Sequence, residues 1–245
     1  MSSESGAAVP SHRPAAFLTR IYGVLRRPRA TFTAGLAAPA WVGLLTVLTL
    51  ITAASRIALF ETEIGRTALV DEWERTAIAF GQDVDDARYE ELKALSAHGF
   101  AYGFSTAVLS GPMLVLAVAA GVFVIFGRVH RERASFAQVC AIATLASVPL
   151  ALRQVVGAIT GYASESTANA MSIGTWFSAL DEASPLARFV GALDLFVIWW
   201  VVVLAIGVGV LYRRNARPLA LTFLGAYAGL ALLLAATMAI LGPSA

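Results

Sequence analysis

Long apolar runs separated by shorter polar segments dominate the pattern of the chain. Each run has at least about 20 residues, which at about 1.5 Å per residue is enough to cross the hydrocarbon core of a bilayer as a helix. The five runs are 40–60, 102–127, 136–162, 189–212 and 219–241. We therefore predict an all-α, polytopic membrane protein whose main domain, 40–245, is a bundle of five transmembrane helices.

The residues before the first run change pattern once. Residues 1–14 mix small, polar and proline residues without an apolar period, so we expect a disordered tail. Residues 15–39 are predicted to hold a helix followed by a linker. Pro28 ends that helix, because proline has no backbone N–H and clashes with the preceding turn.

The predicted helix within 15–39 is amphipathic. Its apolar positions form one stripe of Phe17, Leu18, Ile21, Tyr22 and Leu25. The stripe is flanked by the arginines Arg20, Arg26, Arg27 and Arg29. An apolar stripe with a basic border is typical of a helix that lies in the membrane surface. Packing of the same stripe on cytosolic loops of the protein is the alternative.

The segment 61–101 is the longest polar stretch between two spans. Helix-favouring residues at 67–80 and 84–95, broken at Gly81, predict two short helices above the membrane. A cluster of aspartates in this loop (Asp83, Asp85, Asp86) resembles the start of a calcium loop. It lacks the glycine and the closing glutamate of that loop, so we interpret it as a solvated acidic turn.

The composition agrees with a membrane protein. Hydrophobic residues make up 58% of the 245 residues and charged residues only 14%, whereas about a quarter of the residues in a soluble domain are charged. Arginine outnumbers lysine 17 to 1, which suggests a GC-rich bacterial genome. These features together indicate the cytoplasmic membrane of a bacterium.

The charges of the loops predict the direction of each span. Residues 1–39, 128–135 and 213–218 hold 11 basic and 2 acidic residues, whereas 61–101 and 163–188 hold 5 basic and 13 acidic ones. Loops rich in Lys and Arg are retained on the cytoplasmic side. Every loop thus predicts a cytoplasmic N-terminus, and five spans then place the C-terminus outside.

Three ionisable residues lie inside the predicted spans: Arg56, Arg153 and Asp194. Their positions correspond to depths of about 6, 13 and 8 Å below the outer boundary, so all three belong to one leaflet. A charge in the bilayer core is costly unless it is paired or lines a polar cavity. We therefore predict an ion pair between Arg153 and Asp194, and we expect Arg56 to reach lipid headgroups or Glu61 and Glu63.

The role of the predicted ion pair stays open at this point. The pair fits a contact that fixes helix packing, a polar pocket for an ion, proton or lipid headgroup, or a site for a partner protein. In the same span as Arg153, Pro149 frees a backbone carbonyl and predicts a kink. Gly225 and Gly229 would allow a second helix to approach, so a membrane-protein partner or a homodimer is left open.

The sequence holds no pattern of a known catalytic or metal site. It has no HExxH motif, phosphate-binding glycine loop or dinucleotide fingerprint, and His12, His98 and His130 lie outside the spans. The single cysteine, Cys140, can form neither an internal disulfide nor a zinc site. We expect no enzyme activity, no cofactor, no metal and no nucleic-acid partner.

Short segments spread over most of the membrane part carry a family resemblance. They are 17–22 and 28–32 before the first span, 135–139 and 146–150 in the third, and 193–199 with Gly207 in the fourth. In these segments the chain resembles the bacterial branch of the Yip family (Ypt-interacting proteins). The resemblance implies a five-helix bundle with a cytoplasmic N-terminus. In eukaryotic relatives it implies binding to prenylated Rab-type GTPases and a role in vesicle trafficking.

These features together predict a non-enzymatic integral membrane protein in contact with the lipid bilayer. We expect a Yip-like scaffold that organises protein partners or lipids. The alternative is a small transporter or channel component that uses the pair of Asp194 and Arg153. A hydrated cavity reaching Asp194 would favour transport, and a dry, closed pair would favour the scaffold.

Overall fold

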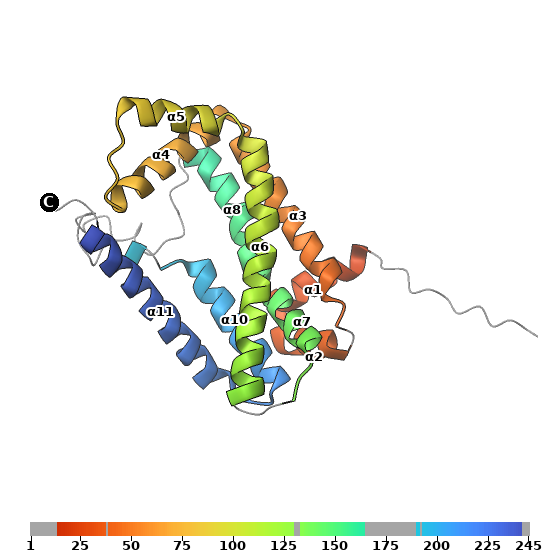
Figure 1. The fold of residues 1–245 in the computed structure, drawn as a ribbon. Coiled ribbons are helices and arrows are strands. Elements are labelled where there is room, and N and C mark those ends of the chain that lie inside the picture. Colours follow the sequence, from red (N-terminus) through yellow and green to blue (C-terminus); the bar gives the residue numbers. More distant parts are fainter. Residues whose placement is uncertain (1–13, 38, 130–132, 165–189, 192, 242–245) are drawn as a thin grey trace, which may run out of the picture.

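The structure is a computed structural model that describes residues 14–37, 39–129, 133–164, 190–191 and 193–241 (Figure 1). Its elements are α1 (Pro14–Arg26), α2 (Pro28–Ala37), α3 (Trp41–Phe60), α4 (Glu63–Ala79), α5 (Asp86–Ser96), α6 (Gly99–Val124), the π-helix η1 (Ile125–Val129), α7 (Phe136–Ala146), α8 (Val148–Ser164), α10 (Leu195–Leu211) and α11 (Ala216–Leu241). All of these elements are helical, which confirms the all-α prediction. Except for Pro14, which begins α1, the predicted disordered tail lies outside the described residues.

Among the described residues, four segments are long and apolar enough to cross a membrane. They are Trp41–Phe60, Gly99–Gly127, Phe136–Ser164 and Ala216–Thr237. A further apolar helix, α10, has 17 residues and is therefore about 25 Å long, somewhat less than a hydrocarbon core of about 30 Å. The predicted bundle of membrane helices is confirmed. The predicted count of five spans is approximate, because α10 is shorter than the other four segments.

Successive long helices run in alternating directions. The helices α3, α7–α8 and α11 run toward the end of the bundle that carries α4 and α5, and α6 and α10 run away from it (Figure 1). Helix α10 packs against α2, α7, α8 and α11, whereas α3 packs mainly against α6 and α8. Arg153 lies in α8, and Asp194 directly precedes α10. The two residues of the predicted ion pair therefore come from neighbouring helices.

The segment predicted as a linker contains the helix α2. It begins at Pro28, a position where the missing N–H of proline costs nothing because the first N–H groups of a helix have no partner within it. The side chain of Phe32 is fully buried, and a Cβ at Gly207 of α10 would lie 2.9 Å from its ring. Pro28 thus ends one helix and also starts a second one, which packs on α7 and α10.

The apolar stripe of α1 is partly packed against the protein core and partly exposed. Phe17 and Ile21 pack against the buried core, whereas Leu18, Tyr22 and Leu25 are exposed. Large apolar side chains exposed side by side on a helix suit contact with lipid better than contact with water. Helix α1 therefore has one side that faces the protein and one that is suited to the membrane surface.

The third predicted span is interrupted at Ser147. Helix α7 ends at Ala146 and α8 begins at Val148, and the hydroxyl of Ser147 donates a hydrogen bond to the carbonyl of Thr144 at 2.8 Å. Pro149 follows two residues later and cannot donate the next hydrogen bond of a continuous helix. The interruption therefore lies within one turn of the residue at which the sequence predicts a kink.

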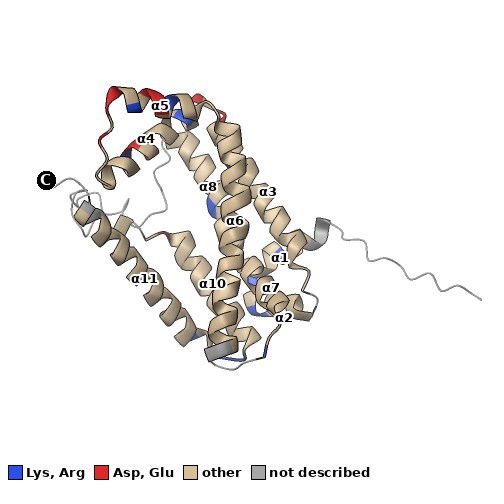
Figure 2. Cartoon of the chain, viewed as in Figure 1, with Lys and Arg blue, Asp and Glu red and all other residues tan. Residues whose placement is uncertain are grey.

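Helices α4 and α5 lie across one end of the bundle, and acidic residues are concentrated in them (Figure 2). They are the two short helices predicted in 61–101, and they are separated at Gly81, whose φ of 76° suits glycine. Oδ1 of Asp85 accepts a hydrogen bond from the N–H of Arg88 at 2.8 Å. Asp85 is therefore the N-cap of α5.

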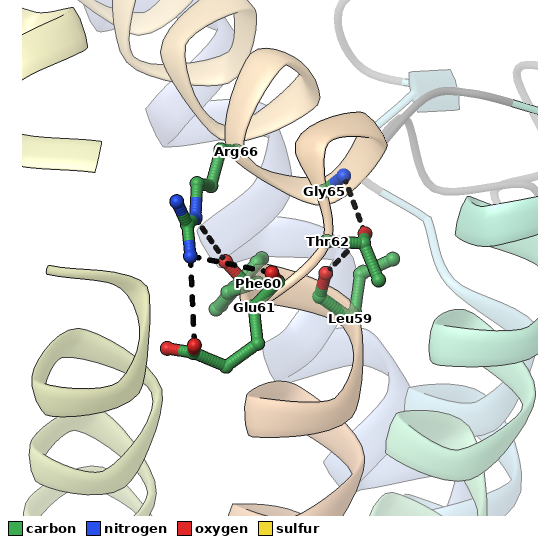
Figure 3. A network of polar contacts seen from close by, with 6 residues as sticks. All are labelled: Leu59, Phe60, Glu61, Thr62, Gly65 and Arg66. Carbon is green, nitrogen blue, oxygen red and sulfur yellow. Dashed lines mark hydrogen bonds and ion pairs between the residues drawn. The ribbon is translucent and has the colours of Figure 1, made fainter. Parts of the chain in front are cut away.

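The corner between α3 and α4 is held by a network of hydrogen bonds (Figure 3). The hydroxyl of Thr62 accepts from the N–H of Gly65 at 3.0 Å and donates to the carbonyl of Leu59 at 2.6 Å. Arg66 reaches back from α4, and its Nε donates to the carbonyl of Phe60 at 3.3 Å. These contacts satisfy carbonyls in the last turn of α3, which lack partners within the helix.

Two glycines leave no room for a side chain near this corner. A Cβ on Gly65 would lie 2.1 Å from the carbonyl oxygen of Leu59, and a Cβ on Gly99 would lie 2.3 Å from that of Phe60. Both clashes involve backbone atoms, which a change of rotamer cannot move. The first turns of α4 and α6 are therefore pressed against the end of α3.

We predict that Gly65→Ala lowers the Tm of the purified protein in detergent. Overpacking costs about 1–3 kcal/mol, which exceeds the roughly 1 kcal/mol that alanine gains over glycine in a helix. Gly225→Ala is the matched control, because a Cβ there meets nothing within 4 Å. Thermal unfolding followed by circular dichroism should give a lower Tm for the first variant and an unchanged or higher Tm for the second. Equal Tm values would contradict the close approach at the corner.

Candidate functional site

Asp194 lies at the N-terminal end of α10 and not inside a helix. Its backbone is extended, with φ −108° and ψ 129°, and α10 begins at Leu195. Its Oδ1 accepts hydrogen bonds from the N–H of Phe196 at 2.7 Å and of Val197 at 3.2 Å. The predicted span 189–212 is therefore corrected: residue 189 lies outside the described residues, and the described helix starts after an aspartate that caps it.

The second carboxylate oxygen of Asp194 is paired with Arg153 of α8. Nε of Arg153 donates to Oδ2 at 2.6 Å. The Asp194 side chain is 5% exposed and that of Arg153 is 34% exposed. A carboxylate that accepts from two amides and a guanidinium needs no proton to satisfy its oxygens. The structure thus brings together the two residues that the sequence places at similar depth.

Tyr227 connects a third helix to the same aspartate. Its hydroxyl accepts a hydrogen bond from the backbone N–H of Asp194 at 3.1 Å, and it belongs to α11. Backbone polar groups outside a helix need partners where water is absent. The Tyr227 hydroxyl supplies one such partner, so α8, α10 and α11 meet at Asp194.

Arg56 points into the bundle, and its hydrogen bonds go to polar side chains of neighbouring helices rather than to Glu61 or Glu63. Its terminal nitrogen Nη1 donates to Oγ1 of Thr106 at 2.7 Å, and its Nε donates to Oε1 of Gln154 at 3.3 Å. These contacts join α3 to α6 and α8. The sequence did not indicate these two partners, because the direction of a side chain depends on how its helix is rotated, which depth alone does not specify.

The guanidinium groups of Arg56 and Arg153 have different kinds of partner among the described residues. Both hydrogen-bond partners of Arg56 are neutral, and the described residues bring no carboxylate within ion-pair distance of it. The carboxylate of Asp194 is matched to Arg153. Glu72 also lies close enough to Arg56 to act on it electrostatically.

Sequence reasoning missed three members of this site: Thr106, Gln154 and Tyr227. Each is a polar side chain within an apolar run, and Gln154 directly follows Arg153. Polar residues in membrane helices commonly hydrogen-bond across helices, so a search for them inside the spans would have found all three.

Of the four arginines predicted at the membrane surface, Arg20 and Arg26 belong to α1, Arg29 belongs to α2, and Arg27 lies between the two helices. Arg20, Arg26 and Arg27 line a groove between these helices, and Arg29 does not. Among the described residues, no group of His, Cys, Asp and Glu side chains is arranged to hold a metal ion, and Cys140 is buried.

Fold and site together define a multi-span helical membrane protein with an ion pair between its helices. The sequence model of the Yip1 domain matches residues 22–239, which is most of the chain. The protein therefore belongs to the Yip family, whose members are in general non-enzymatic membrane proteins. No curated protein and no solved structure matches the chain.

We predict that Arg153→Gln and Asp194→Asn have strongly non-additive effects on stability. Breaking a fully buried ion pair costs about 3–5 kcal/mol, and less is expected here because the Arg153 side chain is 34% exposed. The double variant should lose little more than either single variant, with a coupling energy of about 1–3 kcal/mol. Denaturant unfolding in detergent gives the free energies needed for this cycle.

The exposed pair of Arg88 and Glu91 on α5 is the control for this cycle. Its side chains are 51% and 64% exposed, and such pairs contribute about 0–1 kcal/mol. Arg88→Gln and Glu91→Gln should therefore be nearly additive. If the losses at Arg153 and Asp194 were also additive, their contact would have no structural role.

Proposed function

We propose that the protein is a non-enzymatic, Yip-type scaffold that organises protein partners or lipids in the bacterial cytoplasmic membrane. The observation that carries this proposal is the enclosure of Asp194. Its side chain is 5% exposed, and its oxygens accept from two backbone amides and from Arg153. Such a carboxylate cannot bind and release an ion without weakening its cap on α10 or its contact with Arg153, which joins α8 to α10. It therefore suits a structural joint better than a transport site.

The charge distribution supports a cytoplasmic N-terminus and an external C-terminus. Acidic residues are concentrated in α4 and α5 at one end of the bundle (Figure 2). The basic residues Arg213, Arg214 and Arg217 lie at the connection between α10 and α11, which is at the other end. Since basic loops stay in the cytoplasm, the end with α4 and α5 would face outside.

A small transporter or channel component is the second candidate function. It is favoured by Arg56, which donates to the neutral side chains of Thr106 and Gln154, and by the partial exposure of Arg153. Two guanidinium groups in one polar cluster would attract a small anion. In this alternative, the pair of Asp194 and Arg153 would open during each cycle.

Flux measurements separate these two candidates. A scaffold predicts that proteoliposomes with the purified chain show no proton or chloride flux above that of protein-free liposomes. It also predicts that the same proteins or lipids co-purify repeatedly from mild detergent and are identified by mass spectrometry, against a control preparation from cells without the tagged chain. A flux that Asp194→Asn or Arg56→Gln abolishes would reject the scaffold and support the transporter.

The proposed orientation is tested by labelling single cysteines. Cys140 is fully buried, so Cys140→Ala provides a background without an accessible thiol. In that background, Gln82→Cys lies in the turn between α4 and α5, and Asn215→Cys lies just before α11. A membrane-impermeant maleimide should label the first variant in intact cells and the second only after permeabilisation. The reverse pattern would invert the topology.

A further inference from the structure

The groove between α1 and α2 has the size and charge of a site for an anionic group. Its volume is about 470 Å³, within the range of about 300–1,000 Å³ typical of small-ligand pockets. Arg20, Arg26 and Arg27 line it, and none of the described residues in its wall is acidic. Three guanidinium groups with no carboxylate among them leave the groove strongly positive.

Two helix ends border the groove, the C-terminal end of α1 at Arg26 and the N-terminal end of α2 near Ala30. Ala30 lies in the first turn of α2 and lines the groove. The partial charges of these two helix ends have opposite signs, so the positive charge of the groove comes from its arginines. Gly23 of α1 brings the two walls together, since a Cβ there would lie 2.5 Å from Oγ1 of Thr31 on α2.

The groove borders the exposed apolar side of α1. Leu18 and Leu25 belong to that side, and Tyr22 both belongs to it and lines the groove. The guanidinium carbon of Arg26 lies 5.5 Å from the centroid of the Tyr22 ring, a cation–π contact that holds a charge beside the apolar side. A molecule with a phosphate and acyl chains could contact both surfaces at once.

We propose that this groove binds the phosphate headgroup of an anionic phospholipid from the cytoplasmic leaflet. This proposal rests on the proposed function and orientation, and it specifies the class of lipid that the protein would bind. Arginine suits this ligand because its planar guanidinium donates two parallel hydrogen bonds to phosphate oxygens. A phospholipid is favoured over soluble phosphate because the exposed Leu18 and Leu25 are placed to contact acyl chains.

Lipid retention by the full chain tests this proposal. The protein is reconstituted in phosphatidylcholine nanodiscs with a minor fraction of phosphatidylglycerol, transferred to neutral detergent, and its bound lipid is measured by native mass spectrometry. Removing one basic residue that contacts the anionic headgroup should lower bound phosphatidylglycerol about five-fold. We expect this loss for each of Arg20→Gln, Arg26→Gln and Arg27→Gln.

Arg29→Gln is the matched control for charge. Arg29 is exposed on α2, one residue before Ala30, but it does not line the groove. Retention by this variant should equal that of the wild type. If Arg29→Gln lost as much lipid as the three groove variants, the attraction would be diffuse surface electrostatics, and the proposed site would be rejected.

Ala34→Phe tests the contribution of the cavity independently of its charge. Ala34 is exposed and lines the groove, so a phenylalanine there fills it while every arginine stays in place. We expect lower lipid retention by this variant, together with the Tm of the wild type. Full retention would reject the site.

Displacement of the lipid by millimolar inorganic phosphate would show a soluble-phosphate site and overturn the choice of a lipid. Loss of this site with the co-purification and flux results intact would leave the proposed scaffold standing.

Discussion

The contacts of Asp194 determine how α8, α10 and α11 are joined. The chain leaves helical geometry just before α10, and an unpaired backbone group in hydrocarbon costs several kcal/mol. Asp194 pairs several of these backbone groups. Its carboxylate accepts hydrogen bonds from N–H groups in the first turn of α10, and its own N–H donates to the Tyr227 hydroxyl. The negative charge of this aspartate is balanced by Arg153. One residue thereby allows α10 to be short and holds it to two neighbours.

The two ends of the bundle differ in structure and in charge. At one end, α4 and α5 form an acidic layer that is attached through the tight corner of Thr62, Gly65 and Arg66 (Figures 2 and 3). At the other, α2 is anchored by the buried Phe32, and α1 exposes apolar side chains next to arginines. A stiff interior with chemically distinct ends suits a protein whose surfaces, and not its core, meet partners and lipids.

The helices of the bundle could be located from the sequence with small errors. The expected spans 40–60 and 136–162 differ little from Trp41–Phe60 and Phe136–Ser164, because a long apolar run has no stable alternative to a helix in lipid. The start of α10 was misplaced because apolar residues continue on both sides of Asp194 and hide the break. Helix α2 was missed because Pro28 was interpreted only as the end of a helix.

The sequence by itself determined the membrane class, the family resemblance, the approximate spans and the pairing of Arg153 with Asp194. These properties follow from hydrophobic length and from the position of charges along the chain, which act through the bilayer as solvent. Only the tertiary structure decided that Arg56 turns inward to Thr106 and Gln154, that Tyr227 reaches Asp194, and that α1 and α2 enclose a basic groove. These contacts depend on the rotation and tilt of each helix, which are set by packing against its neighbours and not by its own pattern.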